Sequence, residues 1–454
     1  MKTKNDSVKI NMLSGSIFDK IILFAIPLAA SNILQQLFNS VDVAIVGKFV
    51  GKSALAAVGA NSSIISVLVN LFSGLALGTN VVIATLIGQN KKKEVSSVVH
   101  TSIVLAIISG IIMVVLGIPM AHKVLSLVGT PLNVIDQATL YLSIYLLGMP
   151  FIMLYNFGAA ILRSVGDTRT PMYALVLAGV INIVLNLYLV IFVHLGVAGV
   201  AIATVASNVV STIIVLIVLT KQDEMIKLSI KKLRVEPLYL KRIIAVGAPA
   251  GIQGMVFSLS NVFVQSGINS FGDAGIAGSS TGLTFECFSY YVANSFSQAA
   301  VTFASQNYGA GDYKRCQKIC RISFVEAILF TELLSAIFFI FRYPLAGLFT
   351  SDNDVIQYAV MRMMRVMALE GMTAIYEVPG GVMRGMGQSL LPAALTIFGT
   401  VGFRIIWLFT VFKWYNSFEV LMGVYPASWV FNSVMMLTAY FIVMRRRKVQ
   451  MCGQ

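Results

Sequence analysis

Charged residues are scarce in this 454-residue chain. They make up only 11% of it, whereas a soluble domain carries about 25%. The shortage extends over the whole length, which excludes a soluble enzyme held to a membrane by a single anchor. Instead, 57% of the residues are hydrophobic and the mean hydropathy is +0.84. Apolar runs long enough to cross a bilayer, about 20 residues each, recur from Ile17 to Met444. The composition predicts a protein that crosses a membrane many times.

Cysteine and histidine are also scarce. The four cysteines suggest no disulfide framework, and Cys316 and Cys320 lack the histidines or second cysteine pair of a metal site. A membrane enzyme would need histidines or acids clustered near one membrane face, but His100, His122 and His194 are scattered. We therefore expect no enzyme activity and no cofactor.

The apolar runs are predicted to be helices, because backbone polar groups in lipid must pair within their own segment. The polar N-terminal segment and the long first run do not resemble a cleaved signal peptide. Twelve helices are expected near residues 17–40, 54–80, 94–120, 135–160, 171–194, 197–220, 240–268, 276–304, 317–341, 355–380, 390–413 and 423–444.

The basic residues predict the orientation. A net charge of +14 suggests nucleic-acid binding, but the basic residues occupy short loops. Of the 33, 25 fall on one side of the predicted helices and seven on the other, with Arg404 alone inside a span. The positive-inside rule then places both termini in the cytoplasm. We expect a monomeric, multi-pass protein of the inner membrane that contacts the lipid bilayer and binds no nucleic acid.

The sequence repeats itself at an offset of 221 residues, where Arg163–Pro171 aligns with Arg384–Pro392. Six helices per half give both halves one orientation, with the repeat axis along the membrane normal. We predict an N-terminal lobe (1–220), a cytoplasmic linker (221–240) and a C-terminal lobe (241–454). The linker is either an amphipathic segment or a solvated basic loop. Further related pairs are Gly51 and Gly272, and Gly88 and Gly309, at the same offset, and Pro27 and Pro249, and Asn39 and Asn261, one residue further along.

Polar side chains recur at helical spacing inside the predicted spans. Such residues usually face a bundle interior or water, so we expect them to line a substrate cavity; the alternative for each amide is that it joins helices. Arg404 is expected to pair with a carboxylate of the 355–380 helix. Glu326 and Glu332 are six residues apart and cannot share one helix face, which suggests a structural role for at least one. The predicted cavity residues are Asn32, Gln36, Asn39, Gln253, Asn261, Gln265, Glu286, Tyr290, Glu370 and Glu377.

Several motifs carry a resemblance to a known family. They are Pro27 with Asn39 and Asp42 in the first helix, Gln306–Asp312, and the two Arg-x-x-Gly-x-x-x-x-Pro segments. With them, residues 12–445 resemble the multidrug and toxic compound extrusion (MATE) family of cation-coupled exporters. Its superfamily also holds flippases of lipid-linked oligosaccharides. The resemblance implies a V of two six-helix bundles, related by a pseudo-two-fold axis, that opens alternately to either side.

The resemblance also implies a cation site in the first lobe. The matching positions are Asp42, Asn156, Asn182, Asn186 and Thr204. Many relatives carry an aspartate at the position of Asn186, so Asp42 is the only carboxylate of the proposed site. One carboxylate with neutral oxygens suits either Na⁺ or a proton. Some members use acids of the second lobe instead, and Glu286, Glu370 and Glu377 are the candidates here.

The functional expectation is a secondary antiporter. A carboxylate in a cavity takes up a cation on one side and releases it on the other, and binding must favour one conformation. We expect export of organic compounds, cationic or amphipathic, in exchange for H⁺ or Na⁺. The alternative is a flippase or exporter of an amphipathic or lipid-linked metabolite. It would need a cavity lined by basic residues, and the predicted spans contain almost none.

Overall fold

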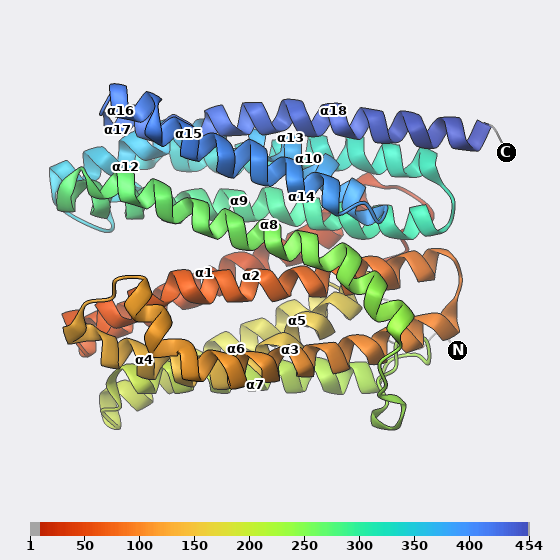
Figure 1. The fold of residues 1–454 in the computed structure, drawn as a ribbon, viewed down its shortest axis with the longest axis horizontal. Coiled ribbons are helices and arrows are strands. Elements are labelled where there is room, and N and C mark those ends of the chain that lie inside the picture. Colours follow the sequence, from red (N-terminus) through yellow and green to blue (C-terminus); the bar gives the residue numbers. More distant parts are fainter. Residues whose placement is uncertain (1–9, 453–454) are drawn as a thin grey trace. The chain divides into compact units, whose positions relative to one another are not determined.

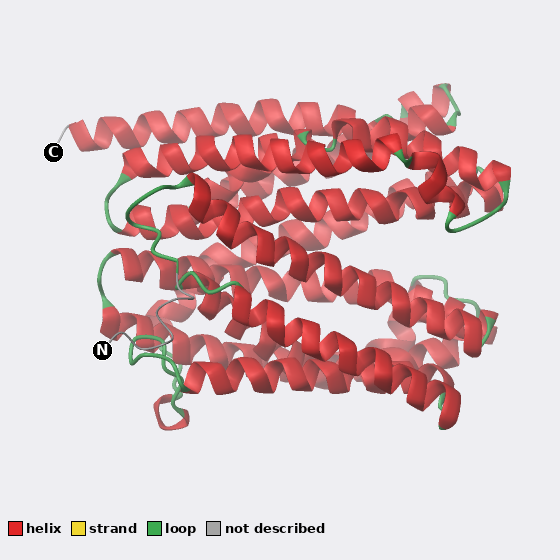
Figure 2. Cartoon of the chain, turned by 180° about the vertical axis from the view of Figure 1, so that it is seen from behind, coloured by secondary structure: helices red, strands yellow, loops and turns green. Residues whose placement is uncertain are grey.

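The structure, a computed structural model, describes residues 10–452, and every regular element within them is helical (Figures 1 and 2). Most helices are long, as expected of backbone that has to pair within its own segment. The first half contains α1 (Phe18–Phe49), α2 (Lys52–Gly88), α3 (Lys92–Leu127), α4 (Leu132–Leu147), α5 (Met149–Ser164), α6 (Arg169–Leu187), the π-helical turn η1 (Tyr188–Phe192) and α7 (Gly196–Thr220).

The second half follows a short 3₁₀ turn, η2 (Ile230–Lys232). Its helices are α8 (Pro237–Asn269), α9 (Gly272–Gly309), α10 (Tyr313–Ile340), α11 (Arg342–Gly347), α12 (Asn353–Val366), η3 (Met367–Leu369), α13 (Met372–Gly385), α14 (Leu390–Thr396), η4 (Ile397–Gly402), α15 (Phe403–Phe409), α16 (Val411–Trp414), α17 (Phe418–Met422) and α18 (Val424–Cys452).

The predicted twelve-helix membrane fold is confirmed. Nine helical segments of the described chain are long and apolar enough to span a membrane, and α4 with α5, bent by 46°, forms a tenth. The other two long segments, α9 and α12 to α13, contain Glu286, Arg362, Glu370 and Glu377. Their polar residues make them less apolar than the ten. α1 extends nine residues beyond the predicted 17–40 run, which places Asp42 well inside a helix.

Two helices divide between the two compact units of the chain. The first unit contains Ala30–Gly251, and the second contains Met12–Ala29 and the chain from Ile252 onward. The divisions fall two residues after Pro27 and Pro249, the prolines inside α1 and α8. The units therefore differ from the predicted lobes, which assigned all of the first helix to one lobe and all of the seventh to the other.

Close packing explains why the first part of α1 belongs to the second unit and the first part of α8 to the first unit. In the first unit, α2 and α8 meet at glycines, and a Cβ added to Gly74 would lie 2.1 Å from the Gly251 nitrogen. In the second unit, the Phe24 and Phe303 rings pack edge to face, 5.7 Å apart. There the Asn307 amide also donates to the Met12 carbonyl over 3.1 Å. Backbone contact and aromatic packing thus decide the unit boundaries.

The internal repeat is visible in the backbone. Gly51 and Gly272, 221 residues apart, both have positive φ (116° and 71°), and so do Gly166 and Gly387 (90° and 80°). Asn90 and Gly311 form a third pair at the same offset, with φ of 57° and 79°. Left-handed backbone favours glycine or asparagine, so the repeat preserves the turns that join its helices.

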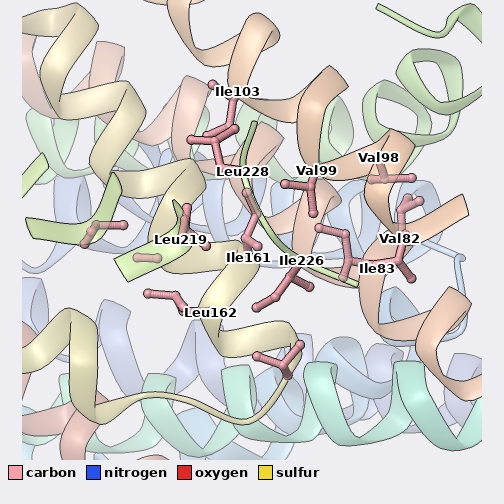
Figure 3. Close-up of a cluster of buried hydrophobic side chains, with 14 of the residues drawn as sticks. Val82, Ile83, Val98, Val99, Ile103, Ile161, Leu162, Leu219, Ile226 and Leu228 are labelled. Carbon is pink, nitrogen blue, oxygen red and sulfur yellow. The ribbon is translucent and has the colours of Figure 1, made fainter. Parts of the chain in front are cut away.

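The segment predicted as a linker packs onto the first unit (Figure 3). Ile226 and Leu228 are buried in the apolar cluster formed with α2, α3, α5 and α7, whereas Lys227 between them is exposed. His100 of α3 accepts a hydrogen bond from the Ser229 backbone N–H through Nε2, over 3.1 Å. The alternation of buried and exposed side chains favours the amphipathic interpretation over a solvated loop.

Candidate functional site

Asp42 lies within the part of α1 that belongs to the first unit, and it is 6% exposed. Its Oδ1 accepts a hydrogen bond from the Asn186 amide of α6. Its Oδ2 lies 3.2 Å from the Thr204 hydroxyl of α7. Both carboxylate oxygens therefore have donors, as a buried charge requires.

The α6 amides extend this group. Asn182 and Asn186 are four residues apart and share one face of α6, and Asn186 Nδ2 lies 3.3 Å from Asn182 Oδ1. The Asn182 amide in turn lies 3.5 Å from the Thr204 hydroxyl. The π-helical turn η1 begins two residues after Asn186, and such irregularities are frequent at functional sites. Three helices thus assemble four of the five predicted cation-site residues.

Asn156, the fifth predicted residue, has a different partner. Its amide donates to the Ile152 carbonyl of its own helix, α5, over 3.0 Å. The sequence analysis also missed Tyr141 of α4, which is 6% exposed and lies within electrostatic reach of Asp42. Tyr141 stacks on Tyr145, with ring centroids 6.4 Å apart. In the sequence, the signal for Tyr141 is its four-residue spacing from Tyr145, which places both rings on one face of a helix.

This group contains the kinds of oxygen atom that a small hard cation needs as ligands. Asp42 supplies one negative charge, and the two amides and the hydroxyl supply neutral oxygens. The Asn186 Oδ1 atom is buried and has no hydrogen-bond partner. No group of three or more His, Cys, Asp or Glu residues suited to a metal occurs between residues 10 and 452. The group therefore suits a proton or a monovalent ion better than a transition metal.

The predicted cavity residues of α1 lie on the first-unit part of the helix. Asn32 and Gln36 are half-buried, and Asn39 is exposed. In the second unit, Gln253 of α8 is 8% exposed and its Oε1 atom has no partner. Gln265 is exposed and donates to Asn269 of the same helix over 2.9 Å.

Most of the predicted acids of the second unit are paired with arginines. Glu286 of α9 accepts from Arg362 of α12, with Oε2 lying 2.9 Å from Nε. Arg362, 2% exposed, also donates to the Ser279 hydroxyl over 2.7 Å. On α13, Glu377 lies 3.4 Å from Arg384. These pairs lower the free-energy penalty of burying each charge.

Glu370, which lies between η3 and α13, differs from those acids. It is 1% exposed and its Oε2 atom has no partner. Tyr290 of α9, another predicted cavity residue, lies within electrostatic reach of Glu370 and Glu377. The predicted acids thus gather in the interior of the second unit.

Two expectations about arginines differ from the structure. Arg404 forms no ion pair within the described part of the chain, although Glu370 of the predicted helix lies within its electrostatic reach. It donates to Asn261 Oδ1 over 3.0 Å. Its guanidinium lies 4.6 Å from the Tyr425 ring centroid and 5.2 Å from that of Phe257. Aromatic faces attract such a cation. Arg362, which falls within the predicted 355–380 helix but was counted among the basic residues outside the spans, is a second arginine buried inside a span.

Comparison with known proteins identifies the family. The sequence model of the MatE family matches the chain twice, at residues 27–188 and 249–410, once in each half of the repeat. The chain belongs to the MatE family. This confirms the resemblance that the helix-1 and Arg-x-x-Gly motifs suggested, and it makes the chain a membrane transporter.

Curated MatE relatives and solved MatE structures cover nearly the whole chain. The chain is 27% identical to "Probable multidrug resistance protein YoeA" of Bacillus subtilis over 96% of both proteins. It is 28% identical to "Probable multidrug resistance protein NorM" of Thermotoga maritima, over 87% of this chain and 86% of that protein. A MATE multidrug resistance transporter solved in an outward-facing conformation matches all of both chains with a TM-score of 0.89 and 24% identity. That structural likeness supports the fold.

Proposed function

We propose that the chain is a secondary antiporter that exports organic compounds in exchange for H⁺ or Na⁺, with Asp42 as the coupling residue. The observation that carries this proposal is the buried carboxylate of Asp42, which is surrounded by the amides and hydroxyl of Asn182, Asn186 and Thr204. The family assignment and the multidrug names of the relatives support export as the direction and organic compounds as the substrates.

The geometry supports coupling through the charge of Asp42. With the carboxylate ionised, the Asn186 and Thr204 donors satisfy it. A bound proton or Na⁺ cancels this charge. The site then needs oxygen acceptors instead of hydrogen-bond donors, because a protonated carboxyl donates and Na⁺ needs oxygen ligands. Asn186 would then present its unpartnered Oδ1 atom. Cation binding therefore favours a different side-chain arrangement, and such differential affinity shifts a conformational equilibrium.

A second candidate is export or flipping of an anionic amphipathic metabolite. The sequence disfavoured it, because few basic residues were expected inside the spans. Arg404 now supports it, since this buried guanidinium forms no ion pair among residues 10–452, although Glu370 lies within its electrostatic reach. Substrate competition separates the candidates: organic cations inhibit export by the first kind of protein, and anionic lipids inhibit export by the second.

Transport by the purified protein in proteoliposomes tests the antiport. We expect an imposed H⁺ or Na⁺ gradient to drive accumulation of a fluorescent organic cation against its own gradient. The gradients are imposed separately, because the two ions share the same oxygen ligands in the proposed site. Empty liposomes and dissipation of each gradient by an ionophore are the controls. Equal accumulation with and without either gradient contradicts the proposal.

We further propose that both termini lie in the cytoplasm and that the membrane is the inner membrane. Support comes from the distribution of basic residues, although Lys2, Lys4 and Lys9 lie outside the described residues. The segment joining α7 and α8 belongs to the same side, because α1 to α7 form six spans. Reporter fusions after Gln454 and within that segment are expected to give a cytoplasmic signal. A periplasmic signal from either fusion contradicts this orientation.

A further inference from the structure

The buried side of α10 contains a carboxylate without a partner. Glu326 is 0% exposed, and neither of its carboxylate oxygens has a hydrogen-bond partner. Three other acids of this unit have partners. Glu332 of the same helix accepts from the Gly371 backbone N–H over 2.8 Å, and Glu286 and Glu377 pair with arginines.

Other buried polar side chains of α10 also have no partners. Ser323 lies one turn before Glu326 on the same face, whereas Thr331 and Ser335 lie one turn apart on another face of the helix. All three are 0% exposed, and none of their hydroxyl oxygens has a partner. Buried polar atoms are nearly always satisfied by protein or water. The unsatisfied Ser323 hydroxyl and Glu326 carboxylate therefore mark a polar site in the packing of α10.

The surroundings of Glu326 provide no compensating cation. Between residues 10 and 452, the ionisable side chain with an electrostatic effect on it is Asp19, in the first turn of α1, which has the same sign of charge. Facing α10 from α9, the Phe296 ring stacks on Phe330 at 5.4 Å. On α13, which also packs against α10, the ionisable groups Glu377 and Arg384 are paired with each other.

An ionised carboxylate is unfavourable in this position. Burial of an unpaired charge carries a penalty so large that the group takes up a proton instead, and the apolar surroundings of a span increase that penalty. Hydroxyl groups beside it can pass a proton along or hold water, since each both donates and accepts.

We propose that Glu326 is a proton-binding site of the second unit, separate from Asp42, and that it exchanges its proton with the help of the Ser323 hydroxyl on the same face of α10. The site takes a proton and no larger ligand. It deepens the proposed function and rests on it in one respect, since proton exchange at Glu326 contributes to transport only if export is coupled to H⁺.

Infrared difference spectroscopy of the purified protein tests the site without any transport. A protonated carboxyl has a carbonyl band that vanishes on ionisation. We expect the wild type to show such a band near neutral pH and to lose it reversibly as the pH rises. Glu326→Gln is expected to lack this titrating band, whereas the matched control Glu332→Gln retains it. Identical titrations of the wild type and Glu326→Gln overturn the proposal.

A second variant tests the proposal if Glu326→Gln does not fold. If Glu326→Gln is not recovered as a monodisperse protein, Glu326→Asp keeps a carboxyl but shortens it, and its titrating band is expected to shift. An unshifted band in Glu326→Asp overturns the proposal. The outcome also stands apart from the proposed function: absence of gradient-driven export by the wild type contradicts the antiport, while the infrared titration still decides whether Glu326 binds an exchangeable proton.

Discussion

Replacing Asp42 with asparagine is expected to abolish gradient-driven export while leaving folding and membrane insertion intact. Asparagine keeps the shape of the side chain, and its oxygen still accepts a hydrogen bond from Thr204 or Asn186. It carries no charge and does not titrate, so cation binding no longer distinguishes one conformation from another. Accumulation in proteoliposomes is expected to fall to the level of empty liposomes, and the elution volume of the purified variant is expected to match the wild type.

A matched control separates loss of coupling from loss of any carboxylate. Asp136 lies on α4 in the same unit but is exposed, so Asp136→Asn removes one acid without touching the site and is expected to leave export unchanged. Asn186→Asp tests the site from the other direction, since a second carboxylate beside Asp42 strengthens cation binding. If Asp42→Asn still drives uphill export at the wild-type rate, coupling must run through glutamates of the second unit.

The sequence predicted the helices and the shared face of the two α6 amides well because both have local signals. Apolar runs identify spans, and i,i+4 spacing places Asn182 and Asn186 on one face of α6. The combination of Asp42 with Thr204, 162 residues away, came from the family resemblance, because no local pattern relates α1 to α7. The structure places them 3.2 Å apart.

The arginines of the second unit show what local signals miss. Arg362 and Arg365 lie three residues apart in a polar stretch of α12, and both were counted among the seven basic residues outside the spans. The structure buries Arg362 and leaves Arg365 exposed, because only Arg362 faces α9 and finds Glu286 there. Which of two neighbouring arginines turns inward depends on a partner 76 residues away.

The amides illustrate the same limit in the first unit. Asn61 is 0% exposed and donates to the Ala57 and Ala138 carbonyls, so it joins α2 to α4. Asn80 donates to the Ala160 carbonyl of α5 over 3.2 Å. These are the structural roles common to amides in membrane bundles. In sequence, neither differs from Asn182, and only the position of Asp42 gives the α6 amides a different significance.

Replacing Arg362 with methionine is expected to destabilise the second unit severely. The substitution removes the donors to Glu286, Ser279 and Tyr425 and leaves the Glu286 carboxylate buried without a cation. Breaking a buried ion pair from one side costs about 3–5 kcal/mol. The monodisperse fraction that survives heating in detergent, followed by size-exclusion chromatography, is expected to fall at a much lower temperature than in the wild type.

Two further variants assign the loss to the unpaired charge. Arg365→Met removes an exposed arginine of the same helix, which pairs with Glu419 at the surface. Because exposed pairs contribute about 0–1 kcal/mol, its melting curve is expected to stay close to wild type. The double variant Glu286→Gln with Arg362→Met removes both charges and is expected to regain most of the lost stability. If the double variant is as unstable as Arg362→Met alone, the loss comes from the packing of the Arg362 side chain, and the ion pair with Glu286 contributes little to the fold.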